Sequence, residues 1–261
     1  MEKRVENPAQ DKNSKTQKTQ KTSPLKSKLQ KSKSKLLSTY YGNPIKDMKL
    51  ICITGSAGKV TTAHFLHEIL HAASQHVAIL ASDSEIKASM LHKFFADAWK
   101  AGANYVIVTA PAESLKKDVF YNLPIYVAAL TNFVDSSLSS PTPTEFLEDS
   151  STLFEMSPEI VVLNSDDLYY QDFLKYTGKS QTLSYGHPQP SNLRIETSKL
   201  YKRGVEATFS LGSSYFTVAS FLTGEPIISY MACAAAIAAS LHIETSVIAE
   251  GIANYNPEEV A

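Results

Sequence analysis

The sequence predicts an α/β fold: a doubly wound, mainly parallel sheet with a P-loop-like turn, a small antiparallel extension and terminal helices. Three observations support this prediction. Between residues 49 and 164, continuous apolar runs alternate with helical segments, as in parallel sheets covered on both faces. After Gly178 the runs are short and partly alternating, and an alanine-rich segment follows Gly224. The chain of 261 residues, 43% of them apolar, is long enough for one large domain.

The first part of this pattern gives the parallel sheet. The strands expected here are continuous apolar runs, at residues 49–54, 76–82, 104–110, 125–131 and 159–164. The helices expected between them are 61–73, 84–100 and 142–156, the last beginning at a Thr-Pro-Thr-Glu cap.

The second part of the pattern gives the extension and the end of the fold. Four short segments with turn residues between them indicate antiparallel strands, at residues 181–186, 193–201, 205–212 and 215–222. Two helices are then expected, at 228–241 and 245–255, and no internal repeat is visible.

The near-zero net charge of −1 conceals a strong asymmetry. Residues 1–36 carry a net charge of +8, whereas the remainder carries −9. The first segment consists largely of Lys, Ser, Thr and Gln, so we predict that residues 1–36 form a disordered basic tail and residues 37–261 the folded domain. The alternative is an arm that binds nucleic acid or an anionic surface, although interleaved aromatic residues are missing from it.

Composition also excludes several classes of protein. Cys52 and Cys233 match no metal-binding or redox spacing, and no apolar run is long enough to cross a membrane. The first 24 residues contain no apolar signal segment, so a cytoplasmic location is expected. His64, His67 and His71 share one helical face but match no zinc motif, and we expect no metal ligands among them.

The segment ICITGSAGKVTT, residues 51–62, is the most informative for chemistry. An apolar strand leads into a turn with Gly55 and Gly58, and Lys59 stands where a helix begins. Glycines let backbone N–H groups approach phosphate, and the helix N-terminus and the lysine both attract negative charge. The hydroxyl that normally ligates Mg²⁺ after such a lysine is replaced by Val60, with Thr61 one residue later.

Several motifs in the same order point to one family. The loop TGSAGKVTT (54–62) resembles the TGTNGKTTT loop of the Mur ligases, the ATP-dependent enzymes that add amino acids to UDP-linked muramic acid in cell-wall synthesis. The lead-in YYGNPIKDMKLICITG (40–55) resembles that of the diaminopimelate-adding branch. ALTNFVDSSLS (129–139) is similar to the family segment TNLTRDHLD, and VVLNSDD (161–167) matches a strand that ends in Asn-x-Asp-Asp. The resemblance covers about residues 38–256, essentially the central ATPase domain.

The resemblance implies a nucleotide site and also marks departures from the family pattern. It assigns ATP as the cofactor, with Lys59 on the phosphates, and gives as binding residues Gly55, Ser56, Ala57, Gly58, Lys59, Val60, Thr61 and Asn164. Positions where the family carries metal ligands or contacts near the adenine differ here: Thr109 (with Glu113 one helical turn further), Ser136, Ser137, Ser150, Ile227 and Tyr230. We therefore expect no catalytic residues and no metal ligands, and we expect Mg²⁺ to contribute little.

The resemblance also implies two flanking domains, for the UDP-sugar and for the incoming amino acid, which we expect to be absent here. Three functions stay open at this point. The first is an ATP-dependent ligase of peptidoglycan precursor synthesis, which acts alone or is completed by a protein partner that supplies the flanking domains. The second is a catalytically impaired pseudoenzyme that retains nucleotide or partner binding. The third alternative is a nucleic-acid or anionic-surface binder acting through residues 1–36.

Overall fold

A computed structural model describes residues 24–133 and 142–257 of the chain. One nine-stranded sheet runs through it, in the order β2-β3-β1-β4-β5-β6-β7-β8-β9. The strands are β1 (Lys49–Thr54), β2 (Val77–Leu80), β3 (Tyr105–Thr109), β4 (Ile125–Leu130), β5 (Ile160–Asn164), β6 (Gln181–Gly186), β7 (Leu193–Tyr201), β8 (Gly204–Leu211) and β9 (Ser214–Ser220).

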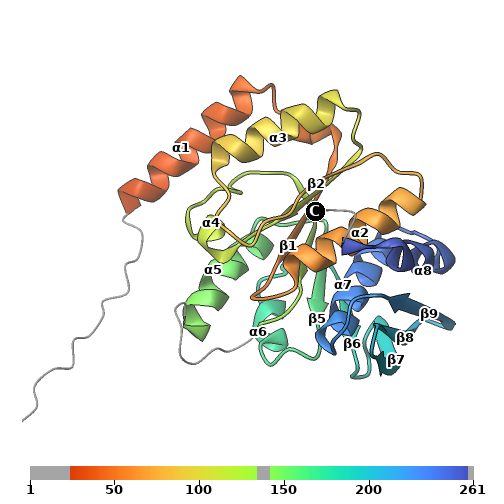
Figure 1. Cartoon of the computed structure of the whole chain (residues 1–261). Coiled ribbons are helices and arrows are strands. Elements are labelled where there is room, and N and C mark those ends of the chain that lie inside the picture. Colours follow the sequence, from red (N-terminus) through yellow and green to blue (C-terminus); the bar gives the residue numbers. More distant parts are fainter. Residues whose placement is uncertain (1–23, 134–141, 258–261) are drawn as a thin grey trace, which may run out of the picture.

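Helices cover both faces of the parallel part of this sheet (Figure 1). They are α1 (Pro24–Tyr40), a 3₁₀ turn η1 (Pro44–Asp47), α2 (Lys59–Ala72), α3 (Ala88–Lys100), α4 (Ala112–Lys116), α5 (Pro143–Glu155), α6 (Tyr170–Leu174), α7 (Pro226–Ser240) and α8 (Thr245–Asn254). Within the ranges 24–133 and 142–257, none of these helices is long and apolar enough to cross a membrane.

Alternation of side chains in β1 divides the interior into two cores. Ile51 and Ile53 face α2, α7 and α8, whereas Leu50 and Cys52 face the opposite core, to which α3 and α5 contribute. All four side chains are fully buried, which explains why β1 is a continuous apolar run. The α/β fold class predicted from the sequence is confirmed.

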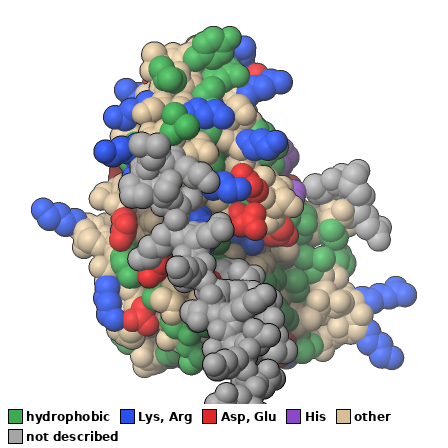
Figure 2. Space-filling view, turned by 90° about the vertical axis from the view of Figure 1, so that its left-hand side faces the viewer, with side chains coloured by type: hydrophobic (Ala, Val, Ile, Leu, Met, Phe, Trp, Pro, Cys, Tyr) green, Lys and Arg blue, Asp and Glu red, His purple; other side chains and the backbone are tan. Residues whose placement is uncertain are grey.

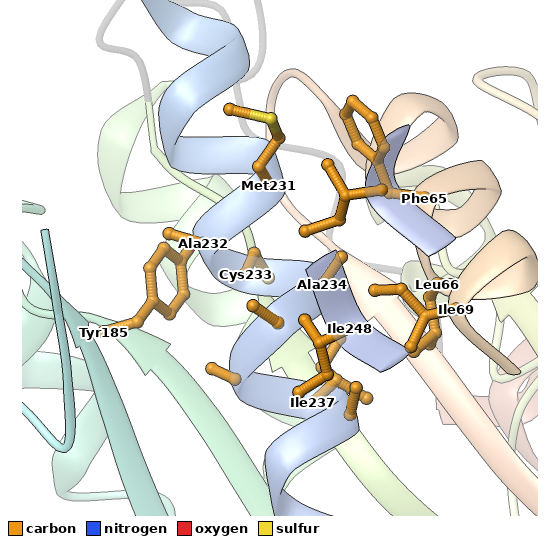
Figure 3. Close-up of a cluster of buried hydrophobic side chains, with 14 of the residues drawn as sticks. Phe65, Leu66, Ile69, Tyr185, Met231, Ala232, Cys233, Ala234, Ile237 and Ile248 are labelled. Carbon is orange, nitrogen blue, oxygen red and sulfur yellow. The ribbon is translucent and has the colours of Figure 1, made fainter. Parts of the chain in front are cut away.

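The core between α2, α7 and α8 depends on small residues (Figure 3). Five alanines between Ala232 and Ala238 are buried in α7, so this helix lies close to the sheet and to α2. Gly251 of α8 lies against the backbone of Ile69 in α2: a Cβ at this position would be 2.3 Å from the Ile69 Cα. These close approaches fix α2, and therefore the loop that precedes it.

Two sequence predictions about elements are wrong. Strand β6 was expected in the antiparallel extension, but it pairs in parallel with both β5 and β7. The short helix α6 carries the chain back between β5 and β6, so β6 runs in the same direction as β5. Only β7, β8 and β9 form the antiparallel part of the sheet.

The predicted boundary at residue 36 falls inside α1, so the expectation of disorder is wrong for residues 24–36. This segment contains good helix formers, Lys, Leu and Gln, and no glycine. It is also tied to the domain, because Ser34 Oγ lies 3.3 Å from His92 Nε2 of α3. The expectation for residues 1–23 falls outside the described residues.

Candidate functional site

The glycine loop between β1 and α2 has the geometry that the sequence predicts. Gly55 and Gly58 have φ values of +142° and +77°, which residues with a Cβ rarely adopt. A Cβ on Gly55 would lie 2.0 Å from Thr131 Oγ1, and one on Gly58 would lie 2.1 Å from the ring of Tyr230. Gly58 is the N-cap of α2, so the backbone N–H groups in the first turn of that helix are directed toward the loop.

Residues that follow β4 hold the loop in place. The backbone N–H of Ala57 donates to Asn132 Oδ1 at 3.0 Å, and Ser56 Oγ donates to the same oxygen at 3.1 Å. Thr131 Oγ1 donates to the carbonyl of Ala57 at 2.6 Å. Asn132 lies in the motif 129–139 but was not among the predicted site residues, because only the folded chain shows which loop it contacts.

Lys59 begins α2 with its ammonium group in a largely buried position. Its side chain is 6% exposed, and Nζ lies 3.1 Å from Oδ1 of Asp83, whose own side chain is 71% exposed. Asp83 follows β2 and was not singled out in the sequence. Val60 and Thr61 are half-buried in the first turn of α2. The arrangement therefore places a buried cation beside an anion that faces solvent.

Asn164 joins the carboxyl ends of β4 and β5. Its Nδ2 donates to the carbonyl of Thr131 at 3.0 Å, and its Oδ1 accepts from the backbone N–H of Asp166 at 3.0 Å. Thr131 also contacts the glycine loop, so the loop and Asn164 lie together at the carboxyl ends of the strands, where ligands bind in doubly wound sheets. Burial raises the pKa of Asp167, whose carboxylate accepts the N–H of Tyr169 at 2.8 Å.

Residues 53–238 match the Mur ligase middle domain. The chain belongs to the Mur ligase family. Among curated relatives, the UDP-N-acetylmuramoyl-L-alanyl-D-glutamate--2,6-diaminopimelate ligase of Clostridium tetani is 27% identical over 201 residues, 72% of this chain and 41% of the relative.

Solved structures show the same fold. A UDP-N-acetylmuramoyl-L-alanyl-D-glutamate--2,6-diaminopimelate ligase has a TM-score of 0.77 at 18% identity, covering 87% of this chain and 50% of that one. An FPGS–AMPPCP complex has a TM-score of 0.67 at 15% identity, covering 86% of this chain and 68% of that one. The chain spans about half the length, or less, of the curated Mur ligases that it matches.

Thr109, at which the sequence resemblance implies a departure from a metal ligand, is the last residue of β3. Its hydroxyl donates to the carbonyl of Ser82 at 2.7 Å and accepts from the N–H of Ser82 at 2.8 Å. These two bonds hold the ends of β2 and β3 together. Glu113, the substitute considered from the sequence, is exposed in α4.

Ser150 is another of the positions at which the resemblance implies a departure from the family pattern. Ser150 is fully buried in α5, and within the described part of the chain its hydroxyl has no hydrogen-bond partner. Ser136 and Ser137 lie outside the described residues. Across residues 24–133 and 142–257, no three His, Cys, Asp or Glu side chains gather to hold a metal ion. Among the described residues, Val60, Thr109 and Ser150 differ from the metal ligands that the resemblance implies at these positions.

Tyr230 of α7 is also a position at which the resemblance implies a departure from the family pattern. Its aromatic ring packs directly on Gly58, so it forms a wall of the loop. A separate cavity of about 700 Å³ lies where β1, β3, β4 and β5 begin, with Lys49, Tyr105 and Tyr126 in its lining. It lies at the opposite ends of these strands from Lys59 and is separate from the glycine loop.

Proposed function

We propose that this Mur ligase family chain binds the phosphate groups of a nucleotide, ATP by family relationship, at residues 55–61, and that it does so without Mg²⁺ and without ligation. The observation that carries the proposal is the environment of Lys59. The Nζ atom of its buried ammonium group lies 3.1 Å from Oδ1 of the exposed Asp83 carboxylate. Phosphate oxygens, like carboxylate oxygens, are negatively charged hydrogen-bond acceptors. A phosphate that displaces Asp83 leaves the buried lysine paired.

The loop backbone supports the same ligand. Gly58, with a φ of +77°, turns the chain so that the first N–H groups of α2 face outward from the helix. Such N–H groups and the positive end of the helix dipole favour phosphate. The similarity to a protein solved with AMPPCP is consistent with a nucleotide as the ligand, although it establishes the fold alone.

The absence of ligation follows from the metal positions. In a ligase of this family, Mg²⁺ would neutralise the charge of the phosphates during transfer to the acid substrate. The side chain of Val60 has no oxygen, and the Thr109 hydroxyl is already bonded twice to Ser82. We propose that these side chains stabilise the fold at the places where ligases hold metal, which leaves a nucleotide-binding, catalytically impaired chain. Ligase activity, with flanking domains supplied by a protein partner, is the competing function.

Calorimetric titration of ATP in EDTA tests the proposed site. Lys59→Met removes the ammonium group and keeps an apolar stem of similar length. Because a hydrogen bond to a charged group contributes about 1.5–3 kcal/mol, this variant should bind ATP about 10- to 150-fold more weakly. Lys117→Met is the matched control, since Lys117 pairs with Glu85 rather than Asp83, and should bind like the wild type. Equal affinity of the Lys59→Met variant and the wild type would refute the site.

A further inference from the structure

Helix α1 contacts the domain through polar side chains. Ser34 is buried, with its hydroxyl 3.3 Å from Nε2 of His92. Lys31 Nζ lies 3.6 Å from Asp118 Oδ1 and 4.8 Å from the ring centroid of Tyr121. The helix lies along α3 at the outside of the molecule (Figure 1), and Ser34 and Lys31 make these contacts with the domain.

Three apolar side chains of α1 are exposed on its outward face, whereas Leu37 is half-buried. Leu29, Leu36 and Tyr40 are 72%, 71% and 82% exposed. Their spacing of seven and four residues places them on one stripe of the helix, two turns and then one turn apart. A surface helix normally directs such a stripe toward the core. In α1 the side chains of Leu29, Leu36 and Tyr40 instead face solvent, and Tyr40 makes an edge-to-face ring contact with Tyr41.

Lysines surround this stripe. Lys28, Lys33 and Lys35 are exposed on the same helix, and the sequence has no Asp or Glu between residues 12 and 46. The surface in Figure 2 shows lysine and hydrophobic side chains interspersed on the upper part of this side of the molecule. The remainder of the chain, from residue 37 onward, has a net charge of −9.

We propose that α1 is a membrane-surface helix, which lays Leu29, Leu36 and Tyr40 into the headgroup region of an anionic bilayer. Apolar side chains flanked by lysines are the pattern of interfacial helices, and lysines near the surface are attracted by anionic headgroups. Tyrosine, with an apolar ring and a polar hydroxyl, suits the headgroup level. The acidic domain is repelled by the same surface, so the protein would dock with α1 facing the bilayer.

Charge complementarity by itself would also fit nucleic acid, but the stripe favours lipid. A phosphate backbone takes up lysines and leaves Leu29 and Leu36 in water, whereas a bilayer takes up both kinds of side chain. This proposal is independent of nucleotide binding, because the stripe lies on α1 and not at the glycine loop.

Flotation of the full chain with vesicles tests the proposal. The wild type should float with vesicles of phosphatidylcholine and phosphatidylglycerol in equal parts, and not with phosphatidylcholine alone. The triple variant Leu29→Ser, Leu36→Ser, Tyr40→Ser keeps every charge and should lose at least about tenfold in vesicle affinity. The matched control changes two exposed apolar residues on β7 and β9, Leu200→Ser and Tyr215→Ser, and should float like the wild type. Equal flotation of the triple variant and the wild type would overturn the proposal.

A second readout reports on insertion itself. The chain has one tryptophan, Trp99, so Leu36→Trp in a Trp99→Phe background places a single reporter on the stripe. Its emission should shift to the blue with the anionic vesicles and stay unchanged with phosphatidylcholine. If emission does not shift while mixed-sequence RNA binds both the wild type and the triple serine variant equally, the surface serves nucleic acid and the lipid proposal is wrong.

Discussion

Replacing Asp83 by Asn should strengthen phosphate binding while weakening the fold. In the ligand-free protein the Asp83 carboxylate pairs with Lys59, so a phosphate must displace it before reaching the ammonium group. Asp83→Asn keeps the shape of the side chain and removes the competing charge. The same change leaves a buried ammonium group without its anion, and this is unfavourable for the folded state.

The size of the effect follows from the exposure of the pair. Asp83 is 71% exposed, so solvent screens the interaction and an exposed-pair value of about 0.2–1 kcal/mol applies. Lys59 is only 6% exposed, which favours the upper end of that range. A difference of about 1 kcal/mol corresponds to roughly fivefold tighter binding of ATP in EDTA, and to about 1 kcal/mol lost from the free energy of unfolding.

Calorimetry in EDTA and urea unfolding measure the two effects on the same samples. Glu85→Gln is the control, because Glu85 lies two residues from Asp83 but pairs with Lys117. It should leave ATP affinity at the wild-type value. If Asp83→Asn leaves the affinity unchanged or lowers it, Asp83 does not compete with the ligand, and the placement of phosphate beside Lys59 is refuted.

Three other outcomes are expected. Gly251→Ala should lower the free energy of unfolding in urea by about 1–3 kcal/mol, because the new Cβ meets the backbone of Ile69. An increase in stability, which is usual for this change within a helix, would contradict the α2–α8 packing. Tyr185→Phe should cost about 1–2 kcal/mol, since the buried hydroxyl donates to the Thr131 carbonyl at 2.6 Å, and an unchanged stability would exclude that bond. Burial raises the pKa of Asp167 above its ordinary 3.8, so the folded state holds this proton more tightly. The wild type should therefore lose stability relative to Asp167→Asn as pH rises from about 3.8 through the raised pKa, and parallel pH profiles would be evidence against that shift.

The parallel sheet and the glycine loop could be predicted because their signals are local. A continuous apolar run identifies β1, and two glycines followed by Lys59 identify the turn into α2. The pairing of β6 could not be predicted in the same way. Its direction depends on the crossover through α6, a helix of five residues that has little periodicity of its own.

The partners of the loop were also beyond the reach of sequence reasoning. Asp83 and Asn132 follow different strands, β2 and β4, and only the order of the strands in the sheet brings them to Lys59 and Ala57. Composition misled for α1, because a lysine-rich segment has few apolar residues to signal order, yet polar contacts at Ser34 hold it on α3. Tyr230 was recognised as a departure from the family, but its packing on Gly58 required the fold.

The central claim, phosphate binding without a metal, is tested most directly by the affinity for ATP with Mg²⁺ and with EDTA. Both titrations use the wild type, and the Lys59→Met variant identifies the site. Val60 and Thr109 offer no free metal ligand, so the two dissociation constants should agree within about threefold, well under the tenfold that 1.4 kcal/mol would give. The account would be contradicted if ATP bound at least about tenfold more tightly with Mg²⁺ than with EDTA, and if the Lys59→Met variant lost this increase.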